Sequence, residues 1–315
     1  MNRNLVDIIV VNWNSRDQLQ ECLRSIELST KKEENIGRIV IVDNASVDGS
    51  ANDLQNFNLP LTIIRNKVNR GFAVACNQGA AGSEADYLLF LNPDVQLFEN
   101  SLSAPIAFME RPENQHIGIV GIQLVDEEGC VRRTCARFPT SRQFFAKMLG
   151  LDRLFPRVFP SHFMVEWDHK NSREVDQVIG AFFLVRRNLF EMLGGFDERF
   201  FVYFEEVDFS LRARQLGYSS FYLTEAQAYH KGGGSSEQIK ARRLFYSLRS
   251  RILYGYKHFS WIAATMLMLG TIIVEPLSRI VLGVAHRSGS EIVETCRAYR
   301  MLWGSMPEWM KGARR

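Results

Sequence analysis

Short apolar runs, each ended by polar residues, recur along the first hundred residues of the chain. They occupy residues 5–11, 39–42, 61–64 and 87–91. Runs of this length are typical of strands that are buried on both faces of a parallel sheet. Between the first two runs one helix face is apolar, formed by Leu19, Cys22, Leu23 and Ile26. The alternation predicts an α/β fold, a doubly wound and mostly parallel sheet with helices on both faces.

The pattern continues beyond residue 100 with an irregular interval. A strand is expected at 118–125, followed by a hairpin turn, and the region 138–175 reads as loops and short helices over a site. Order returns with four elements: a strand at 180–186, a helix at 188–193, a helix from Glu205 to Gly217 and a strand at 219–223. We therefore expect a domain over residues 1–237, with one half at about 1–125 and the other at about 126–237.

Beyond residue 237 the composition changes. Between Glu237 and Glu275 no acid occurs, and six basic residues are interleaved with six aromatic ones. The 14 residues Trp261–Val274 carry no charge, and we expect Glu275-Pro276 to break the run. A membrane-spanning helix needs about 20 apolar residues, so this run is short for a crossing. We expect 238–315 to be a helical extension whose apolar run anchors at an anionic membrane surface. A buried helical hairpin or a homodimer contact is the alternative.

Composition narrows the classes of protein. The chain has 315 residues and a net charge of +3, which is too small to indicate nucleic acid as the main partner. Its five cysteines are scattered and include no C-x-x-C pair, which favours free thiols in a reducing compartment. The chain enters a strand within a few residues of Met1, so we expect no signal peptide and a cytoplasmic location.

Polar residues follow three of the predicted strands. These strand ends are Asn12-Trp13-Asn14, Asp43-Asn44 and Asn92-Pro93-Asp94. The carboxyl ends of parallel strands meet at one sheet edge, where nucleotides bind in open α/β folds. A carboxylate such as Asp94, with room for water and phosphate oxygens, suits Mg²⁺. Asn-Pro-Asp is also common in ordinary turns, which is the structural alternative.

A second group of acids begins the helix at 205. Glu205, Glu206 and Asp208 crowd its first turn. A favourable interaction with the helix dipole explains one such acid, at about 0.3–1 kcal/mol, but gives little reason for three. His230 lies before three glycines and is a loop residue on its own. Paired with Asp94, it becomes a candidate second metal ligand or diphosphate contact.

Taken together and in order, seven motifs resemble family 2 glycosyltransferases of the GT-A fold, closest to the bacterial rhamnosyltransferase-like branch. They cover about residues 5 to 255 and read VNWN at 11, IVDNAS at 41, NRGF at 69, LNPD at 91, GGFDE at 194, FEEVD at 204 and His230. Each motif alone is weak, and the ordered set is specific.

The resemblance implies an inverting, metal-dependent transfer of a sugar from a nucleoside diphosphate. Asp94 and His230 would hold Mg²⁺ or Mn²⁺ against the diphosphate, and Asp43 would contact the base or ribose. The nucleotide-binding residues that the resemblance implies are Val11, Trp13, Asp43, Asn69, Gly71 and Asn92. The donor it favours is dTDP-rhamnose, with UDP-hexoses next. The acceptor is a glycan or a lipid-linked sugar in cell-surface polysaccharide synthesis.

Glu206 matches the general base of the family, with two departures from the usual pattern. Asn92 stands where the family's first metal-site acid occurs, and the base position holds Glu rather than Asp. Glu205, Glu206 and Asp208 therefore remain alternatives as the catalytic acid. Independently, displacement at a sugar carbon needs a base for the acceptor hydroxyl and positive charge near the leaving diphosphate.

Other classes of protein fit less well. A dinucleotide-dependent oxidoreductase lacks its G-x-G-x-x-G after the first strand, where this chain has NWNS. A sugar-nucleotide pyrophosphorylase lacks its glycine-rich, arginine-bearing loop there. A non-catalytic sugar-nucleotide sensor or membrane scaffold is the remaining alternative, and the joint presence of Asp94, Glu206 and His230 argues against it.

Overall fold

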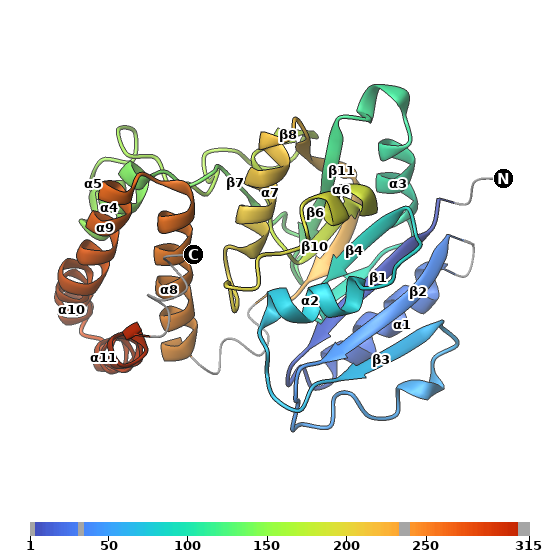
Figure 1. Ribbon diagram of the computed structural model, residues 1–315, viewed down its shortest axis with the longest axis horizontal. Coiled ribbons are helices and arrows are strands. Elements are labelled where there is room, and N and C mark those ends of the chain that lie inside the picture. Colours follow the sequence, from blue (N-terminus) through green and yellow to red (C-terminus); the bar gives the residue numbers. More distant parts are fainter. Residues whose placement is uncertain (1–3, 31–34, 233–239, 308–315) are drawn as a thin grey trace. The chain divides into compact units, whose positions relative to one another are not determined.

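In the computed structural model, the residues described are 4–30, 35–232 and 240–307, and they form two compact units (Figure 1). The sheet unit comprises residues 1–137, 163–198 and 205–235, and the helical unit comprises 138–162, 199–204 and 236–315. Part of the glycine-rich stretch after His230 (233–236) and the expected domain boundary at 237–238 lie outside the described residues.

The sheet unit is built around one large mixed sheet. Its strand order is β3-β2-β1-β4-β10-β6-β11-β5, and β8 also pairs with β11. The strands are β1 Val6–Asn12, β2 Ile36–Asp43, β3 Leu61–Arg65, β4 Tyr87–Leu91, β5 Val95–Leu97, β6 Ile117–Val125, β8 Arg173–Val175, β10 Phe182–Arg186 and β11 Ser219–His230. β1 to β4 pair in parallel, whereas β10 runs antiparallel to both β4 and β6. A small second sheet pairs β7 Cys135–Ala136 with β9 Gln177–Val178.

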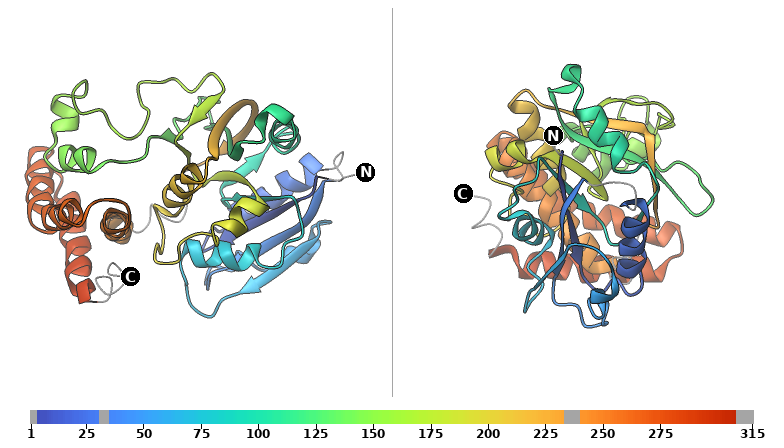
Figure 2. Two further views of the ribbon diagram at one scale, coloured as in Figure 1. Left: turned by 45° about the horizontal axis from the view of Figure 1, so that its top comes forward. Right: turned by 90° about the vertical axis from the view of Figure 1, so that its right-hand side faces the viewer.

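Helices cover both faces of this sheet, as the sequence predicts (Figure 2, right). In β1, Ile8 and Val10 enter one core with α1 and α3, whereas Ile9 and Val11 enter the other with α2, α6 and α7. The helices are α1 Gln18–Thr30, α2 Phe72–Ala80, α3 Ser103–Met109, α6 Arg187–Met192 and α7 Glu205–Gln215. α2 lies close against β1, because a Cβ on Gly79 would stand 2.5 Å from Ile9 Cγ2.

β11 corrects one expectation. The strand predicted at 219–223 continues to His230, which is therefore the last residue of a strand rather than a loop residue. The pairing with β6 shifts its register between Leu223 and Gln227, and this irregularity interrupts the alternating pattern on which the prediction rested.

The helical unit packs around its own small core. The residues of that core are Leu248, Ile252, Met268, Tyr299 and Leu302. Its helices are α4 Ser141–Met148, α5 Leu151–Leu154, α8 Lys240–His258, α9 Trp261–Leu269, a π-helical turn Gly270–Val274, α10 Glu275–Ala285 and α11 Gly289–Gly304. Residues 138–162, which the sequence assigned to the first 237 residues, therefore belong to the same compact unit as the C-terminal helices.

The apolar C-terminal segment is longer than expected. We expected it to break at Glu275-Pro276, yet α9, the π turn and α10 form one helix over Trp261–Ala285. Pro276 directly follows the π-helical turn Gly270–Val274, a local change of helical hydrogen bonding at the point where proline lacks an N–H. With 25 residues, it is the one helix among the described residues that is long and apolar enough to cross a membrane, and a third of its most apolar stretch is buried.

Candidate active site

The carboxyl ends of β1 and β2 fix Asp43 through a buried network. Asn12 lies opposite Asp43 in the parallel pairing, and its Nδ2 donates to Asp43 Oδ1 at 3.0 Å. Asn12 Nδ2 also lies 2.9 Å from Ser50 Oγ, and Asn12 is fully buried. The other oxygen, Asp43 Oδ2, lies 3.8 Å from Arg65 Nη1. Asp43 is thus held rigidly at the sheet edge, where the sequence predicted a nucleotide contact.

Asn44 organises the neighbouring loop. Its Nδ2 donates to Asn69 Oδ1 at 3.0 Å and to the carbonyl of Gly71 at 3.1 Å. Its Oδ1 accepts from the backbone N–H of Arg70 at 3.0 Å. Gly71 has φ 89°, a conformation that L side chains rarely adopt, which explains glycine at the start of α2. Asn44 therefore places Asn69 and Gly71 beside Asp43, a role that the sequence analysis did not assign although the residue stands within its motif.

Trp13 and Val11 differ in exposure. Val11 packs in the core between the sheet and α2, whereas Trp13, in the loop after β1, is half-buried. Two hydrogen bonds tie this loop to the one after β2: Asn14 N–H donates to Ser46 Oγ at 3.0 Å, and Val47 N–H donates to Asn14 Oδ1 at 2.8 Å. Within this motif Trp13 and Asn14 are partly exposed, whereas Val11 and Asn12 are buried.

Asp94 and His230 come together from distant parts of the sequence. Asn92-Pro93-Asp94 is a turn, closed by the Val95 N–H donating to the Asn92 carbonyl at 3.1 Å, and it leads into β5. β11 pairs antiparallel with β5, placing His230 opposite Val95. His230 Nε2 and Asp94 Oδ1 lie 3.4 Å apart, and each side chain is 10% exposed. The turn Asn92-Pro93-Asp94, which was the structural alternative, therefore positions Asp94 next to His230.

This pair has the chemistry of a partial metal site. A carboxylate oxygen and an imidazole nitrogen are both ligands of divalent ions. Within residues 4–30, 35–232 and 240–307, no group of three His, Cys, Asp or Glu side chains is arranged to hold a metal. Asp94 and His230 offer two ligands, and an ion bound there would take its remaining ligands from water or from ligand oxygens.

Glu205 and Glu206 bury their carboxyl groups at the start of α7. Glu205 is 4% exposed, and the Oε2 atoms of both residues are buried without a hydrogen-bond partner among the described residues. Burial, together with the charge of Glu206, raises the pKa of Glu205 well above its ordinary value. Burial also raises the pKa of Glu206, partly offset by the backbone N–H groups of Glu206 and Val207. Exposed acids at a helix N-terminus do not combine buried oxygen atoms with raised pKa values. The combination therefore favours a functional role for this pair.

The two glutamates face α2 and the start of β10. A Cβ on Gly180 would stand 4.0 Å from Glu206 Cβ. On α2, burial raises the pKa of the Cys76 thiol, and the charges of Glu205 and Glu206 raise it further. The thiol is therefore an inert neighbour of the carboxyl pair rather than a nucleophile.

Asp208 has a different environment. It is fully buried, and its Oδ2 accepts from Arg212 Nε at 2.8 Å. The same guanidinium donates to the carbonyls of Leu193 and Gly195, at 2.7 and 2.9 Å. Gly194 and Gly195 have φ 70° and 77°, as glycine permits. Asp208 and Arg212 thus fasten α7 to the turn after α6, which positions the first residues of α7.

Asn77 holds the next part of that turn from α2. Its Nδ2 donates to the Phe196 carbonyl at 2.9 Å, and the Phe196 N–H donates to its Oδ1 at 2.9 Å. A Cβ on Gly195 would come within 2.6 Å of Asn77 Oδ1. Gly195 is therefore needed partly so that this amide can approach the backbone. The sequence offered no pattern that singles out Asn77.

Residues 7–194, more than half of the chain, match the family model described as Glycosyl transferase family 2. The chain belongs to this family. It is 26% identical over 276 residues to an N-acetylglucosaminyl-diphospho-decaprenol L-rhamnosyltransferase of Mycobacterium tuberculosis, covering 82% of this chain and 86% of the relative. It is 25% identical over 175 residues to rhamnosyltransferase WbbL of Escherichia coli, covering 55% and 62%. These similarities confirm the rhamnosyltransferase-like resemblance.

Solved structures of glycosyltransferases share the fold. The mannosyltransferase PcManGT from Pyrobaculum calidifontis, solved with GDP-Man and Mn²⁺, superposes with TM-score 0.55 at 18% identity, covering 98% of this chain and 85% of that one. GalNAc-T7, solved with UDP, GalNAc and Mn²⁺, gives 0.56 at 15% identity, covering 81% and 48%. The predicted GT-A fold class is confirmed.

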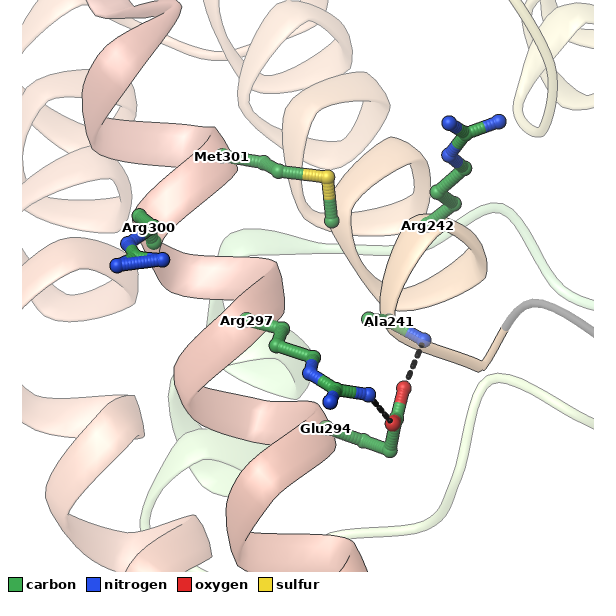
Figure 3. A pocket seen from close by; sticks show the side chains of 6 residues that line it. All are labelled: Ala241, Arg242, Glu294, Arg297, Arg300 and Met301. Atoms are coloured by element: carbon green, nitrogen blue, oxygen red, sulfur yellow. Dashed lines mark hydrogen bonds and ion pairs between the residues drawn. The ribbon is translucent and has the colours of Figure 1, made fainter.

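The helical unit carries a pocket of about 350 Å³ between the start of α8 and α11 (Figure 3). Glu294 there accepts from the Ala241 N–H at 2.9 Å and from Arg297 Nη1 at 2.7 Å. In the figure Arg242 and Arg300 extend to opposite sides and do not converge on the pocket. None of the site residues predicted from the sequence lines it.

Proposed function

We propose that this glycosyltransferase moves a sugar from a nucleoside-diphosphate donor, rhamnose from dTDP-rhamnose, to a lipid-linked or glycan acceptor with inversion at the sugar carbon. The observation that carries the proposal is the 3.4 Å approach of Asp94 and His230, which come from the ends of β4 and β11. This approach of a carboxylate and an imidazole supports a metal site at a strand end, where α/β sheets bind nucleotides. The names of the rhamnosyltransferase relatives support this donor and this acceptor class.

Asp94 and His230 would hold a divalent cation, Mg²⁺ or Mn²⁺, with Asn92 beside them. The Mn²⁺ named with the mannosyltransferase and GalNAc-T7 structures supports this assignment. When bound, such an ion supplies positive charge to the departing diphosphate. Asn92 is a weaker ligand than the aspartate usual at its position, so Asp94 carries most of the binding.

The nucleoside would lie along the edge formed by β1 and β2. Asp43 would accept hydrogen bonds from the base or ribose, and its orientation is set by Asn12. Trp13 offers a half-buried aromatic face, and Asn69 and Gly71 border the same edge through Asn44. A UDP-hexose would use the same residues, so the nucleotide and sugar are the points to be tested first.

Glu206 would act as the general base that accepts the proton of the acceptor hydroxyl. A carboxylate whose pKa is raised by burial accepts a proton more readily at neutral pH than an exposed one. Proton removal on one side of the sugar carbon and departure of the diphosphate on the other give a single displacement with inversion. Glu205 would tune the charge of Glu206, and Asp208 would position the helix.

The enzyme would work at the cytoplasmic surface of the cell membrane, where a lipid-linked acceptor is found. In this proposal the nucleotide sugar binds to the half at about 1–125, and the acceptor binds to the half at about 126–237. The extension 238–315 associates with the membrane.

Thermal unfolding with a panel of nucleotide sugars tests the donor. A ligand at 100 times its Kd stabilises the folded state by about 2.7 kcal/mol. We expect dTDP-rhamnose with Mn²⁺ to raise the melting temperature more than UDP-hexoses do, and chelator or Asp94→Ala to reduce the shift. A larger shift with a UDP-hexose would replace the donor, and no shift with any nucleotide would contradict the proposal.

Release of nucleotide separates the enzyme from the non-catalytic alternative. Incubation with donor, with and without a lipid-linked N-acetylglucosamine acceptor, should yield free nucleoside diphosphate from the wild type. Binding of the donor without any release, with either acceptor condition, would favour the sugar-nucleotide sensor.

A further inference from the structure

The two units carry opposite charge. Of the 38 Lys and Arg residues, 18 belong to the helical unit, against 6 of the 35 Asp and Glu residues, so this unit has a net charge of +12. The sheet unit, with the remaining 20 basic and 29 acidic residues, has a net charge of −9. The small net charge of the whole chain conceals this division. A strongly basic unit is electrostatically complementary to a polyanionic partner.

The helix Trp261–Ala285 exposes one apolar face. Seven of its exposed large apolar residues recur at intervals of three or four, as on one side of a helix: Ile262, Met266, Leu269, Ile273, Leu277, Val281 and Val284. Val274 and Leu282, which are 41% and 37% exposed, lie outside this row. Trp261 is 73% exposed at its start. The only charged residues of the helix, Glu275 and Arg279, do not belong to this row. We call the row the apolar stripe.

The opposite face of this helix is packed in the helical unit. Ala264, Leu267 and Thr271 are fully buried. Arg251 of α8 donates to Thr271 Oγ1 at 2.8 Å and also pairs with the buried carboxylate of Glu275. Arg279 Nη2 donates to the other oxygen of Glu275 at 2.8 Å. The helix is thus bound along its inner side by apolar contacts and by ion pairs of Glu275 with Arg251 and Arg279.

A second exposed apolar segment adjoins the helix. Residues 149–158, at and after α5, expose Leu149, Leu154, Phe155 and Val158. α4, which leads into this segment, contacts α9 and the π turn (Figure 1). The side chain of its last residue, Met148, lies 3.1 Å from the Cβ position of Gly270. Two exposed apolar groups therefore come from neighbouring elements of one basic unit.

We infer that the helical unit binds an anionic lipid bilayer in plane, with the apolar stripe and residues 149–158 sunk into one leaflet. This inference deepens the proposed function, because it says which residues contact the membrane and how the helix is oriented there. It rests on the proposed function only in one respect, namely that a lipid-linked acceptor explains why the enzyme binds a membrane. An amphipathic helix with a basic surround lies in the headgroup region in this way. The helix is long enough to cross a bilayer. To do so, however, its inner face would have to separate from the rest of the helical unit, and Glu275 would have to separate from Arg251.

Charge also favours lipid over a second copy of the chain as the occupant of this face. Two helical units, each with a net charge of +12, would repel on approach. Anionic headgroups attract them, by about 1 kcal/mol for each Lys or Arg near the surface.

Vesicle binding tests the footprint. We expect the full chain to sediment with vesicles containing phosphatidylglycerol, less so at high salt but still measurably, because the apolar contacts are not screened. The double variant Ile273→Glu/Leu277→Glu should lower the partition coefficient at least about tenfold, and Phe155→Glu should lower it measurably. Val47→Glu, at a 90% exposed apolar residue of the sheet unit, is the matched control and should leave the partition coefficient unchanged. Equal melting temperatures would show that the variants fold.

Probe depth distinguishes in-plane binding from crossing. In a chain whose two exposed cysteines are replaced (Cys130→Ser and Cys296→Ser), a fluorophore is placed by Ile262→Cys, Ile273→Cys or Val284→Cys. Nitroxide lipids should quench all three from the same shallow depth. A middle probe deeper than both ends would overturn the inference in favour of a crossing helix.

Two further outcomes would also overturn it. One is the absence of vesicle binding at low salt. The other is a dimer that forms without lipid and that Ile273→Glu/Leu277→Glu dissociates. Because vesicle binding needs no donor, a protein that binds vesicles but no nucleotide sugar would refute the proposed function and leave this inference intact.

Discussion

Glu205 and Glu206 form the least ordinary pair of residues in the sheet unit. Each buries a carboxylate oxygen without a hydrogen-bond partner among the described residues, an arrangement that costs about 1–3 kcal/mol for each group. The sequence predicted that acids gather here but left three alternatives, because sequence spacing does not reveal which acid has a basic partner. The structure pairs Asp208 with Arg212 and leaves the Oε2 atoms of both glutamates without a hydrogen-bond partner among the described residues.

Replacing Glu206 by Gln tests its role as the base. The side chain keeps its shape but loses the ability to accept a proton, so turnover should fall about 10²–10⁴-fold while donor binding is unchanged. Single-turnover transfer and donor titration measure the two effects. Glu205→Gln is the matched variant, with a smaller loss of rate. Normal turnover in Glu206→Gln, together with a loss of turnover in Asp208→Asn, would show that Glu206 is not the base and that Asp208 is.

Glu205→Gln should stabilise the protein in a pH-dependent way. Because burial raises the pKa of Glu205 in the folded state, its contribution is favourable at low pH and is lost as pH rises above the ordinary carboxyl range. The gain from Glu205→Gln should therefore grow with pH, by at most about 1.4 kcal/mol per pH unit, until the folded-state pKa is passed. Urea unfolding from pH 4 to pH 8 measures this. The exposed Glu128→Gln is the control, and a gain that shrinks with pH would contradict the assignment.

At the scale of elements, the sequence predicted strands better than the contacts that position them. Buried apolar runs such as 87–91 were located to the residue, because nothing else explains five apolar residues ended by Asn-Pro. The extension of β11 to His230 was missed, because a register irregularity breaks the alternating pattern. Pro276 was taken as a break because local rules disfavour it inside a helix, whereas the structure places it directly after a π-helical turn. Asn44 and Asn77 act through tertiary hydrogen bonds, which have no signature in sequence.

The attachment of α7 gives a prediction about stability. Arg212→Met removes the guanidinium that pairs with buried Asp208 and the hydrogen bonds to two carbonyls, so we expect a loss of about 3–5 kcal/mol of unfolding free energy. Donor binding at Asp43 should survive at temperatures where the variant is folded. Arg214→Met, two residues on and with its side chain 42% exposed, is the control and should cost less than about 1 kcal/mol. Equal losses in the two variants would show that α7 is not held by this network.

At the scale of the whole molecule, the sheet unit followed from local pattern and the helical unit did not. The sheet is assembled from strands and helices that alternate along the chain, which sequence rules describe well. The helical unit combines 138–162 and 199–204 with the C-terminal helices, and such long-range packing leaves no periodic signal. The opposite net charges of the two units follow from this assignment of 138–162 and 199–204 to the helical unit together with the C-terminal helices.

The most direct test of the central claim is transfer by the full-length protein. Labelled dTDP-rhamnose is incubated with lipid-diphosphate-linked N-acetylglucosamine and Mn²⁺, and the lipid product is characterised by mass spectrometry and by NMR of the new anomeric linkage. We expect a rhamnosyl product of inverted configuration, absent with chelator, restored by added Mn²⁺ or Mg²⁺, and absent with Asp94→Ala. Full transfer in chelator, or retention of the donor's anomeric configuration, would contradict an inverting displacement assisted by a metal held at Asp94 and His230.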